Sequence, residues 1–259
     1  MHPILFEIAG WRVPTYGVLL AAAFLIALRV GLQYGRREGV SPETLMNLWL
    51  WVLLSGIVGA KILLYLTDLD YYLHNPGALL SSLRSAGVFY GGLGLGIAVG
   101  LLYVRRHGLP LWKCLDLSSP PLALAHSIGR LGCLAAGCCY GRPTTLGWGI
   151  TFHDPEARAI TGVPLDLALH PTQILLSITS FLIFLLLVYL YRHKAFDGQI
   201  FAAYLIVETA TRFGLEFLRG DPRGFALGLP TSQTLSVAGF ATGVALYLRR
   251  RRQPLAPLL

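Results

Sequence analysis

Residues 126–142 read His-Ser-Ile-Gly-Arg-Leu-Gly-Cys-Leu-Ala-Ala-Gly-Cys-Cys-Tyr-Gly-Arg and follow an apolar run that begins near Leu115. They place Arg130 between Gly129 and Gly132. A guanidinium keeps its proton inside proteins, and burying it uncompensated at membrane depth costs several kcal/mol. The stretch therefore predicts an anionic partner for Arg130 near the end of a membrane-spanning segment.

The composition of the whole chain is typical of a membrane protein. Of 259 residues, 54% are hydrophobic and 13% are charged, whereas soluble domains carry roughly 25% charged residues. The charges gather between apolar runs of about 17 to 22 residues, the length that crosses a bilayer core. This pattern favours one polytopic membrane domain over residues 1–259 and disfavours a large soluble core.

Seven apolar segments are expected to be membrane-spanning helices, so the predicted fold class is an all-α polytopic membrane protein. They cover residues 16–35, 47–67, 87–104, 115–128, 172–191, 199–218 and 232–248. Pro120-Pro121 is expected to break or kink the fourth helix, and membrane proteins place such breaks where the backbone lines a cavity. Residues 129–171 are expected to form an extracytoplasmic loop between the fourth and fifth helices.

The basic residues indicate how these segments are oriented. The formal net charge is +8, which would suggest a nucleic-acid partner only if it formed a surface patch. The basic clusters instead stand in short connections, at residues 36–37, 105–113, 192–194 and 249–252. The positive-inside rule then puts the C-terminus in the cytoplasm and the N-terminus outside. No nucleic-acid partner and no cleavable secretory signal are expected.

A second arginine is expected to join the first. Arg219 stands at the outer end of the sixth segment, on the same expected face as Arg130, with Glu216 and Asp221 beside it. Two guanidinium forks at one depth fit a clamp for phosphate oxygens. The alternative for Arg130 is a side chain that snorkels to the membrane edge. Arg212 and Glu216, four residues apart, are expected to pair on one helix face.

Other polar and small residues have structural interpretations that compete with functional ones. The glycines of residues 91–96 are expected to let two helices approach closely. Cys133, Cys138 and Cys139 lack the paired C-x2-C units of a zinc site, so no metal is expected. Small-residue packing is favoured for these cysteines over a disulfide between Cys133 and either neighbour, which the outer side of a membrane permits. His170, before a proline, is more typical of a hydrogen-bonded helix start than of a catalytic base.

Taken in order, several motifs resemble those of the prolipoprotein diacylglyceryl transferases of bacterial inner membranes. The matching residues are Gly129 to Gly132 closed by Gly141, Tyr16-Gly17, residues 59–61, residues 89–92, residues 170–173, and Arg212, Glu216 and Arg219. Each motif alone is a weak signal, whereas their order and spacing together are specific. The resemblance extends along most of the chain and is consistent with seven spans in the orientation given above.

The resemblance implies a reaction and its partners. The diacylglyceryl group of phosphatidylglycerol would move to the lipobox cysteine thiol in the signal peptide of a preprolipoprotein, forming a thioether and releasing glycerol phosphate. The enzyme would act as a monomer in the inner membrane, without a cofactor. The implied catalytic residues are Arg130, Arg219, His170 and Tyr90. The implied substrate-binding residues are Arg130, Arg219, Tyr16, Gly129, Gly132, Gly141, Gln173 and Glu216.

Two positions depart from the pattern of the resembled family. Tyr90 stands where that family has histidine, and a phenol with a pKa of about 10 is a poor base at neutral pH. Cys133 and Cys138 stand where it has asparagine and glutamate. The proton acceptor is therefore open between His170 and the leaving phosphate. A paralogue with another acceptor and a phospholipid-binding protein without catalysis are alternative functions. An anion transporter would need a polar line across the bilayer and an internal repeat, and neither is evident.

Overall fold

The structure, a computed structural model, describes residues 2–8, 10–82, 87–222, 224–226 and 228–253. The chain divides into two compact units. One comprises Met1–Gly31 with Leu115–Leu259, and the other comprises Leu32–Cys114. The predicted single domain over residues 1–259 includes termini and a segment, 83–86, that lie outside the described residues.

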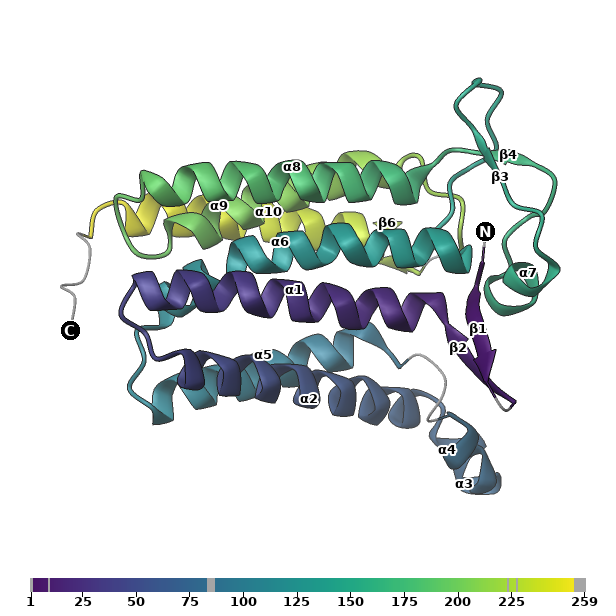
Figure 1. Ribbon diagram of the computed structural model, residues 1–259, viewed down its shortest axis with the longest axis horizontal. Helices are drawn as coiled ribbons and strands as arrows, with labels where there is room; N and C mark the ends of the chain where they lie inside the picture. The colour runs from purple at the N-terminus through teal and green to yellow at the C-terminus, as the bar shows by residue number, and fades with distance from the viewer. Residues whose placement is uncertain (1, 9, 83–86, 223, 227, 254–259) are drawn as a thin grey trace. The chain divides into compact units, whose positions relative to one another are not determined.

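The predicted all-α class is confirmed, and each of the seven apolar segments is helical (Figure 1). The long helices are α1 (Thr15–Arg37), α2 (Pro42–Thr67), α5 (Phe89–Arg106), α6 (Leu111–Ala136), α8 (Thr172–Arg192), α9 (Gln199–Glu216) and α10 (Thr231–Arg250). Shorter helices are α3 (Leu69–His74), α4 (Gly77–Ser82) and α7 (Pro155–Thr161). Antiparallel pairs join β1 (Ile4–Ile8) to β2 (Trp11–Pro14), β3 (Ile150–Thr151) to β4 (Ala168–Leu169), and β5 (Phe225–Ala226) to β6 (Leu229–Pro230).

Three of these helices, α1, α2 and α8, are long and apolar enough to cross a membrane by length and composition. They expose large apolar side chains, among them Leu25, Trp51 and Leu182, each more than half accessible. Exposed apolar surface on this scale marks a membrane or protein contact in a natural protein. The helices therefore have the surface that a lipid-facing helix requires.

Helix α6 is longer than predicted, and of the predicted break or kink at Pro120-Pro121 the break does not occur. It runs through Pro120-Pro121 without ending and continues to Ala136, so Gly129, Arg130 and Gly132 are helical and the expected loop start at residue 129 was wrong. Membrane helices tolerate prolines where neighbouring helices and hydroxyl side chains compensate the lost backbone bonds. Pro120 and Pro121 leave the Asp116 and Leu117 carbonyls without their usual intrahelical donors, and the Ser119 hydroxyl makes a separate bond to the neighbouring Leu115 carbonyl at 2.7 Å.

Packing against α8 and α9 holds α6 in its helical form. Ala123 lies in a buried cluster with residues of both neighbours; the other members are Ile183, Leu187, Ile200 and Tyr204. Further along, the Ser127 hydroxyl donates to the Ser177 carbonyl and the Ser177 hydroxyl donates to the Ser127 carbonyl, each at 2.9 Å. Tertiary contacts on this face therefore override the local preference of the two prolines to end a helix.

Residues 137–171, between α6 and α8, form a small structured region rather than an open loop. Strands β3 and β4 and helix α7 surround a buried cluster of apolar side chains, namely Tyr140, Phe152, Ala157, Val163 and Leu169. Asp154 caps the start of α7 by accepting from the Glu156 N–H at 2.9 Å. Gly137 and Tyr140, on either side of Cys138 and Cys139, both contact this cluster.

In the unit Leu32–Cys114, helices α2 and α5 approach at glycines, as predicted. A Cβ added to Gly59 would lie 2.6 Å from Leu95 Cβ, and one added to Gly92 would lie 2.6 Å from the Gly56 carbonyl oxygen. Such distances leave no room for any side chain. The Val88 N–H also donates to the Ala60 carbonyl at 2.9 Å, so the start of α5 is bonded directly to α2.

Candidate functional site

Three segments far apart in the sequence meet through their backbones beside the end of α9. The Arg142 N–H donates to the Leu218 carbonyl at 2.9 Å, and the Gly220 N–H donates to the Tyr140 carbonyl at 3.0 Å. The His170 N–H donates to the Arg142 carbonyl at 2.9 Å. This three-segment crossing joins residues 140–142, residue 170 and residues 218–220.

The crossing is close enough to require glycine at two positions. A Cβ on Gly141 would lie 2.6 Å from His170 Cβ, and a Cβ on Gly220 would lie 2.5 Å from the Gly141 carbonyl oxygen. The Arg142 Nε also donates to the Arg219 carbonyl at 3.0 Å. The main chain of Arg219 is therefore fixed from several directions, and Gly141, a predicted site residue, is needed for steric reasons.

Arg219 is a buried cation with one unused donor. Only 5% of the residue is exposed, and its Nε and Nη2 donate to the two carboxylate oxygens of Asp221, both at 2.8 Å. Burial disfavours the charge, but the Asp221 carboxylate outweighs it and raises the pKa of Arg219. Its Nη1 is buried and has no hydrogen-bond partner among the described residues. An unfilled donor on a buried guanidinium is suited to an incoming anion.

Arg130 and Arg219 share a neighbour, Cys139. The Arg130 Nη1 donates to the Cys139 sulfur at 3.7 Å, and the charges of both arginines act on the Cys139 thiol. The two arginines that were predicted to act together thus lie at one place. Arg130 belongs to α6, and Arg219 belongs to the segment after α9. Both are in the unit that contains Leu115–Leu259.

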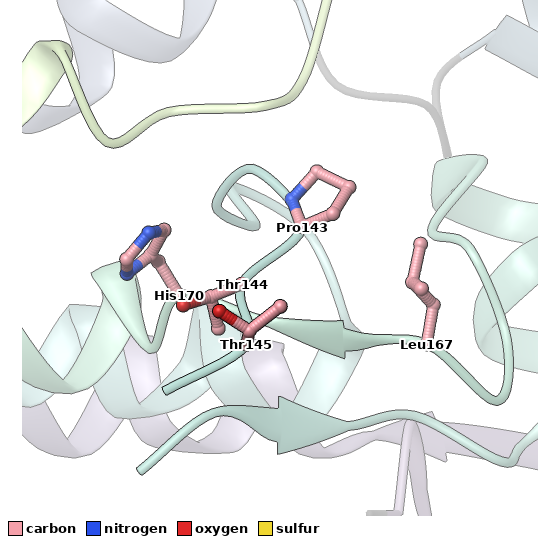
Figure 2. A pocket seen from close by; sticks show the side chains of 5 residues that line it. All are labelled: Pro143, Thr144, Thr145, Leu167 and His170. Atoms are coloured by element: carbon pink, nitrogen blue, oxygen red, sulfur yellow. The ribbon is translucent and has the colours of Figure 1, made fainter. Parts of the chain in front are cut away.

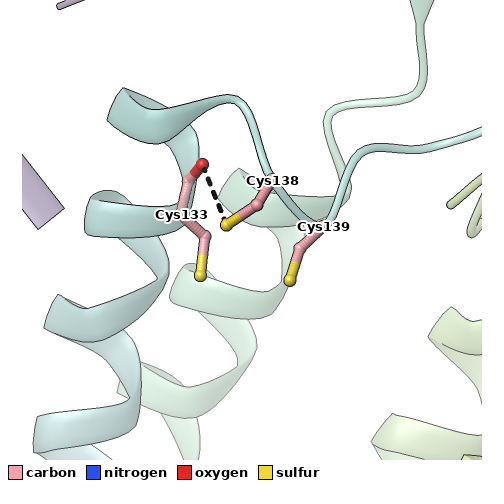
Figure 3. A group of neighbouring side chains, drawn as sticks. All are labelled: Cys133, Cys138 and Cys139. Carbon is pink, nitrogen blue, oxygen red and sulfur yellow. Dashed lines mark hydrogen bonds between the residues drawn. The ribbon is translucent and has the colours of Figure 1, made fainter. Parts of the chain in front are cut away.

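Three cysteine sulfurs converge at the same place. The sulfurs of Cys133, Cys138 and Cys139 all lie within 4.8 Å of one another, and all three thiols are free (Figure 3). The Cys138 thiol donates to the Cys133 carbonyl at 3.8 Å. No disulfide joins the described cysteines, so the bond that the sequence left open is absent. Spacing alone could not predict this cluster, because it depends on the turn at Gly137 after α6.

His170 lies at the edge of an open pocket of about 440 Å³ (Figure 2). Its ring packs edge-on against Trp148, with centroids 6.2 Å apart, and its Nδ1 is buried without a hydrogen-bond partner in the described part of the chain. The pocket is lined by Pro143, Thr144, Thr145, Leu167 and His170. The imidazole thus belongs to the lining of the pocket, while its Nδ1 is buried.

Two of the predicted binding residues, Tyr16 in α1 and Gly132 in α6, lie near one another. A Cβ on Gly132 would lie 3.1 Å from the Tyr16 ring, so Gly132 lets α1 and α6 pack together at Tyr16. Gly129 differs, because nothing lies within 4 Å of an added Cβ. Packing within the described chain therefore explains glycine at position 132 and does not explain it at position 129.

The remaining predicted residues have varied positions. Gln173 is fully buried, and its side-chain N–H donates to the Cys138 carbonyl at 2.9 Å. Glu216 is buried and pairs with Arg212 at 3.4 Å, which confirms that predicted pair. Tyr90 is the second residue of α5, 45% exposed, and belongs to the unit Leu32–Cys114.

Sequence reasoning missed three residues that shape the site. Asp221 was seen only as a neighbouring charge, whereas it holds two of the three nitrogens of the Arg219 guanidinium. Thr172 is fully buried, and its hydroxyl donates to the Cys139 carbonyl at 2.8 Å. Arg142 bonds the Arg219 backbone. Arg142 stands directly after Gly141 in the sequence, but this position does not predict its bond to the Arg219 carbonyl.

Comparison with known proteins agrees with the motifs. The family model for prolipoprotein diacylglyceryl transferase matches residues 3–249. A phosphatidylglycerol–prolipoprotein diacylglyceryl transferase of Clostridium tetani is 35% identical over 248 residues, which is 95% of this chain and 97% of that protein. Relatives with the same activity in their names occur in Clostridium perfringens, 36% identical over 95% of this chain and 94% of that protein, and in Finegoldia magna, 33% identical over 98% and 97%. The chain therefore belongs to the prolipoprotein diacylglyceryl transferase family.

Proposed function

We propose that this chain transfers the diacylglyceryl group of phosphatidylglycerol to the lipobox cysteine of a preprolipoprotein signal peptide. The observation that carries the proposal is the buried Arg219, whose Nη1 has no partner among the described residues, with Arg130 beside the same thiol. Two guanidinium groups at one place match a phosphodiester in charge and in donor geometry. The names of the relatives supply the substrates.

The chemistry requires fixed positive charge at the phosphate. When the lipobox sulfur attacks the diacylglyceryl carbon, the bond from that carbon to the phosphate oxygen breaks, and glycerol phosphate leaves. Preorganised donors that face the developing charge lower the barrier to such a step. We assign Arg219 Nη1 and Arg130 to the phosphate, with Asp221 holding Arg219 in orientation.

The other predicted residues complete the proposed site. His170 is the candidate base, since its Nδ1 is unpaired in the described chain and its ring borders a pocket. Tyr90 is proposed to donate a hydrogen bond to substrate rather than to accept a proton. Tyr16, Gly129, Gly132, Gly141, Gln173 and Glu216 are proposed to shape the binding site around the two arginines.

The membrane arrangement is proposed to follow the charge pattern. All seven long helices cross the bacterial inner membrane, with the N-terminus extracytoplasmic and the C-terminus cytoplasmic. The chain acts as a monomer, and residues 1–259 form one membrane domain. Residues 137–171 and the three-segment crossing then lie on the extracytoplasmic side, where signal peptides of exported lipoproteins are processed.

Purified protein in detergent with phosphatidylglycerol and a lipobox peptide is the direct test. Wild-type protein is expected to form the thioether peptide and glycerol phosphate, measured by mass spectrometry. Arg130→Ala and Arg219→Ala are expected to abolish product while the proteins remain folded. Arg158→Ala, on the exposed side of α7, is the matched control and is expected to keep full activity.

The outcomes separate the function from the residue roles. A wild-type protein that forms no product under conditions in which a known family member is active would contradict the proposed function. Full activity in Arg130→Ala or Arg219→Ala would contradict that residue's role alone. Restored growth of a bacterium depleted of its own transferase would establish the activity in a cell.

A further inference from the structure

The three-thiol cluster of Cys133, Cys138 and Cys139 has no role in the function proposed so far. All three residues are buried or half-buried, and their sulfurs gather in one place (Figure 3). Three thiols within 4.8 Å are more than small-residue packing requires. In the described part of the chain, no fourth His, Cys, Asp or Glu joins them as a ligand.

The backbone holds the cluster in a conformation that is costly by itself. Cys139 has a φ of +62°, a left-handed conformation that costs a non-glycine residue roughly 1–2 kcal/mol. Such conformations persist where surrounding contacts determine them, and they are common at functional sites. The contacts here are the Thr172 hydroxyl on the Cys139 carbonyl and the Gln173 amide on the Cys138 carbonyl. The adjacent thiols of Cys138 and Cys139 are thus held in one place without a disulfide.

The spacing of the sulfurs is close to that of a metal–thiolate site. Zinc binds thiolate sulfur at about 2.3 Å, so that two sulfurs on a tetrahedral ion lie about 3.8 Å apart. The observed sulfurs, all within 4.8 Å of one another, would move toward a common centre by about 1 Å or less. Soft thiolates select ions such as Zn²⁺ and Cu⁺. Three protein ligands with one open position are typical of catalytic rather than structural zinc sites.

The neighbouring charges fit a metal–thiolate complex. Three thiolates and one divalent ion leave one formal negative charge. The Asp221 carboxylate already pairs with Arg219, whereas Arg130 directs its Nη1 at the Cys139 sulfur at 3.7 Å. A guanidinium that donates to a ligating sulfur stabilises it as a thiolate, in the manner of outer contacts in metal sites. The Arg130 charge therefore balances that of the three-thiolate complex, before a fourth ligand binds.

We propose that Cys133, Cys138 and Cys139 bind one d10 metal ion of the Zn²⁺ class through three thiolates and leave its fourth position for the acceptor thiol. The second part rests on the proposed transferase function. A metal-bound thiol loses its proton, and the thiolate is the nucleophile that forms a thioether. The site would thus supply the thiol activation for which Tyr90 is poorly suited, and it would do so in place of His170, the candidate base named above.

The step balances without a redox partner. The lipobox thiol releases its proton to solvent as its sulfur takes the fourth position. That sulfur then donates an electron pair to the diacylglyceryl carbon, and a carbon–sulfur bond forms while the carbon–oxygen bond to phosphate breaks. Glycerol phosphate leaves with the electron pair of that bond, next to Arg130 and Arg219, and the thioether leaves the metal because it is a weaker ligand than a thiolate.

Metal binding is tested first, apart from activity. Protein purified in detergent with a phosphine reductant is stripped with a chelator and titrated with Zn²⁺ or Co²⁺. We expect one equivalent by elemental analysis and a sulfur-to-cobalt charge-transfer band. Addition of a lipobox peptide is expected to shift that band, and the same peptide with serine for cysteine is expected to leave it unchanged.

Variants locate the site. Cys133→Ala, Cys138→Ala and Cys139→Ala are expected to lose the band, whereas Cys114→Ala, at a buried cysteine outside the cluster, is expected to keep it. The wild-type chain gives a further readout that does not depend on how a variant folds. Zn²⁺ is expected to protect the three clustered thiols from alkylation, and chelation is expected to remove that protection. No stoichiometric binding, or no protection, would overturn the metal site.

Activity assays distinguish the metal proposal from the transferase proposal. Chelation is expected to abolish product formation, and one equivalent of Zn²⁺ is expected to restore it. A stripped protein that keeps full transferase activity would overturn the metal's role in catalysis and leave the transferase function standing. Metal binding in a protein that never forms product would support the metal site and contradict the transferase function.

Discussion

Glycine at position 141 is required by contacts of the main chain, whereas glycine at position 129 is not. An added Cβ at Gly141 would meet the backbone and Cβ of His170, and one at Gly129 would meet nothing within 4 Å. Gly141→Ala is therefore expected to lower the unfolding temperature and abolish product formation, because the three-segment crossing cannot close. Gly129→Ala is expected to fold as stably as wild type. Thermal unfolding in detergent measures both, and a stable, active Gly141→Ala would contradict the steric role.

Arg219 should not tolerate lysine, although the charge would be kept. A lysine ammonium cannot form the two parallel bonds with Asp221 and still present a free donor. Loss of one charge-assisted hydrogen bond, worth about 1.5–3 kcal/mol, is expected to lower kcat/KM of Arg219→Lys roughly 10- to 100-fold. Steady-state kinetics with phosphatidylglycerol measure this, and circular dichroism checks the fold. Wild-type kinetics in this variant would show that Asp221 does not orient Arg219.

At the scale of single residues, the sequence predicted which arginines belong to the site but not which side chains bind them. Arg130 was predicted from the cost of burying a guanidinium at membrane depth, and Arg219 from its place at the outer end of the sixth apolar segment. The fork between Arg219 and Asp221, and the Cys139 sulfur next to both arginines, depend on chain turns after α6 and α9. Periodicity and spacing contain no information about those turns, because each depends on contacts with distant segments.

Among the helices, the α2–α5 pair offers a sharp test of glycine packing. An added side chain at Gly91 would meet the Gly59 carbonyl and Leu63 Cβ, whereas Gly94 on the same helix has open space around it. Gly91→Leu is expected to force the helices apart and to lower the unfolding temperature by several degrees. Gly94→Leu is the matched control and is expected to leave it unchanged. Equal unfolding temperatures for the two variants would contradict close packing at Gly91.

Helix positions were predictable, and helix lengths were less so. Apolar runs located each long helix to within a few residues at most ends, because a bilayer core sets the minimum length of an apolar segment. The exceptions are the start of α2 and both ends of α6, which differ from the prediction by several residues. The local preference of proline predicts that the helix breaks or kinks at Pro120-Pro121. The helix continues instead, because Ala123 is buried against α8 and α9.

Across the larger unit, a buried ion cluster joins α6, α9 and α10. Asp116 is fully buried and accepts from the Gly198 and Phe201 N–H groups at 2.7 and 2.9 Å. The Lys194 ammonium lies 3.1 Å from Asp116 and 2.7 Å from Asp197. The Arg250 Nε donates to the Asp197 carbonyl at 3.1 Å. None of these partners was predicted, since most of the contacts join residues far apart in the sequence, up to 85 positions for Asp116 and Phe201.

Removal of the lysine from this cluster is expected to destabilise the protein. Lys194→Met would leave two buried carboxylates without their cation, at a cost of about 3–5 kcal/mol. Arg251→Met, at an exposed arginine just after α10, is the matched control and is expected to cost little. Thermal unfolding in detergent compares the two, and similar unfolding temperatures would argue against a stabilising cluster.

The same cluster predicts a dependence of stability on alkaline pH. Burial opposes the charge of Lys194, but Asp116 and Asp197 outweigh it and raise its pKa. A raised folded-state pKa contributes stability that is fully present below the unfolded value of about 10.4 and is lost as pH rises through the folded value. The unfolding temperature of wild type is therefore expected to fall more steeply above about pH 10 than that of Lys194→Met. Parallel curves for the two proteins would contradict this linkage.

The three-segment crossing also sets the order of events during synthesis. Residues 140–142 leave the ribosome long before residues 218–220, and Arg219 reaches its place only by bonding to that earlier segment. A nascent chain that ends after α8 therefore has Arg130 but not its partner arginine. Under the proposed function, the two-arginine headgroup site is complete only after α9 and residues 218–220 have been made, so activity would have to wait until most of the helices are synthesised.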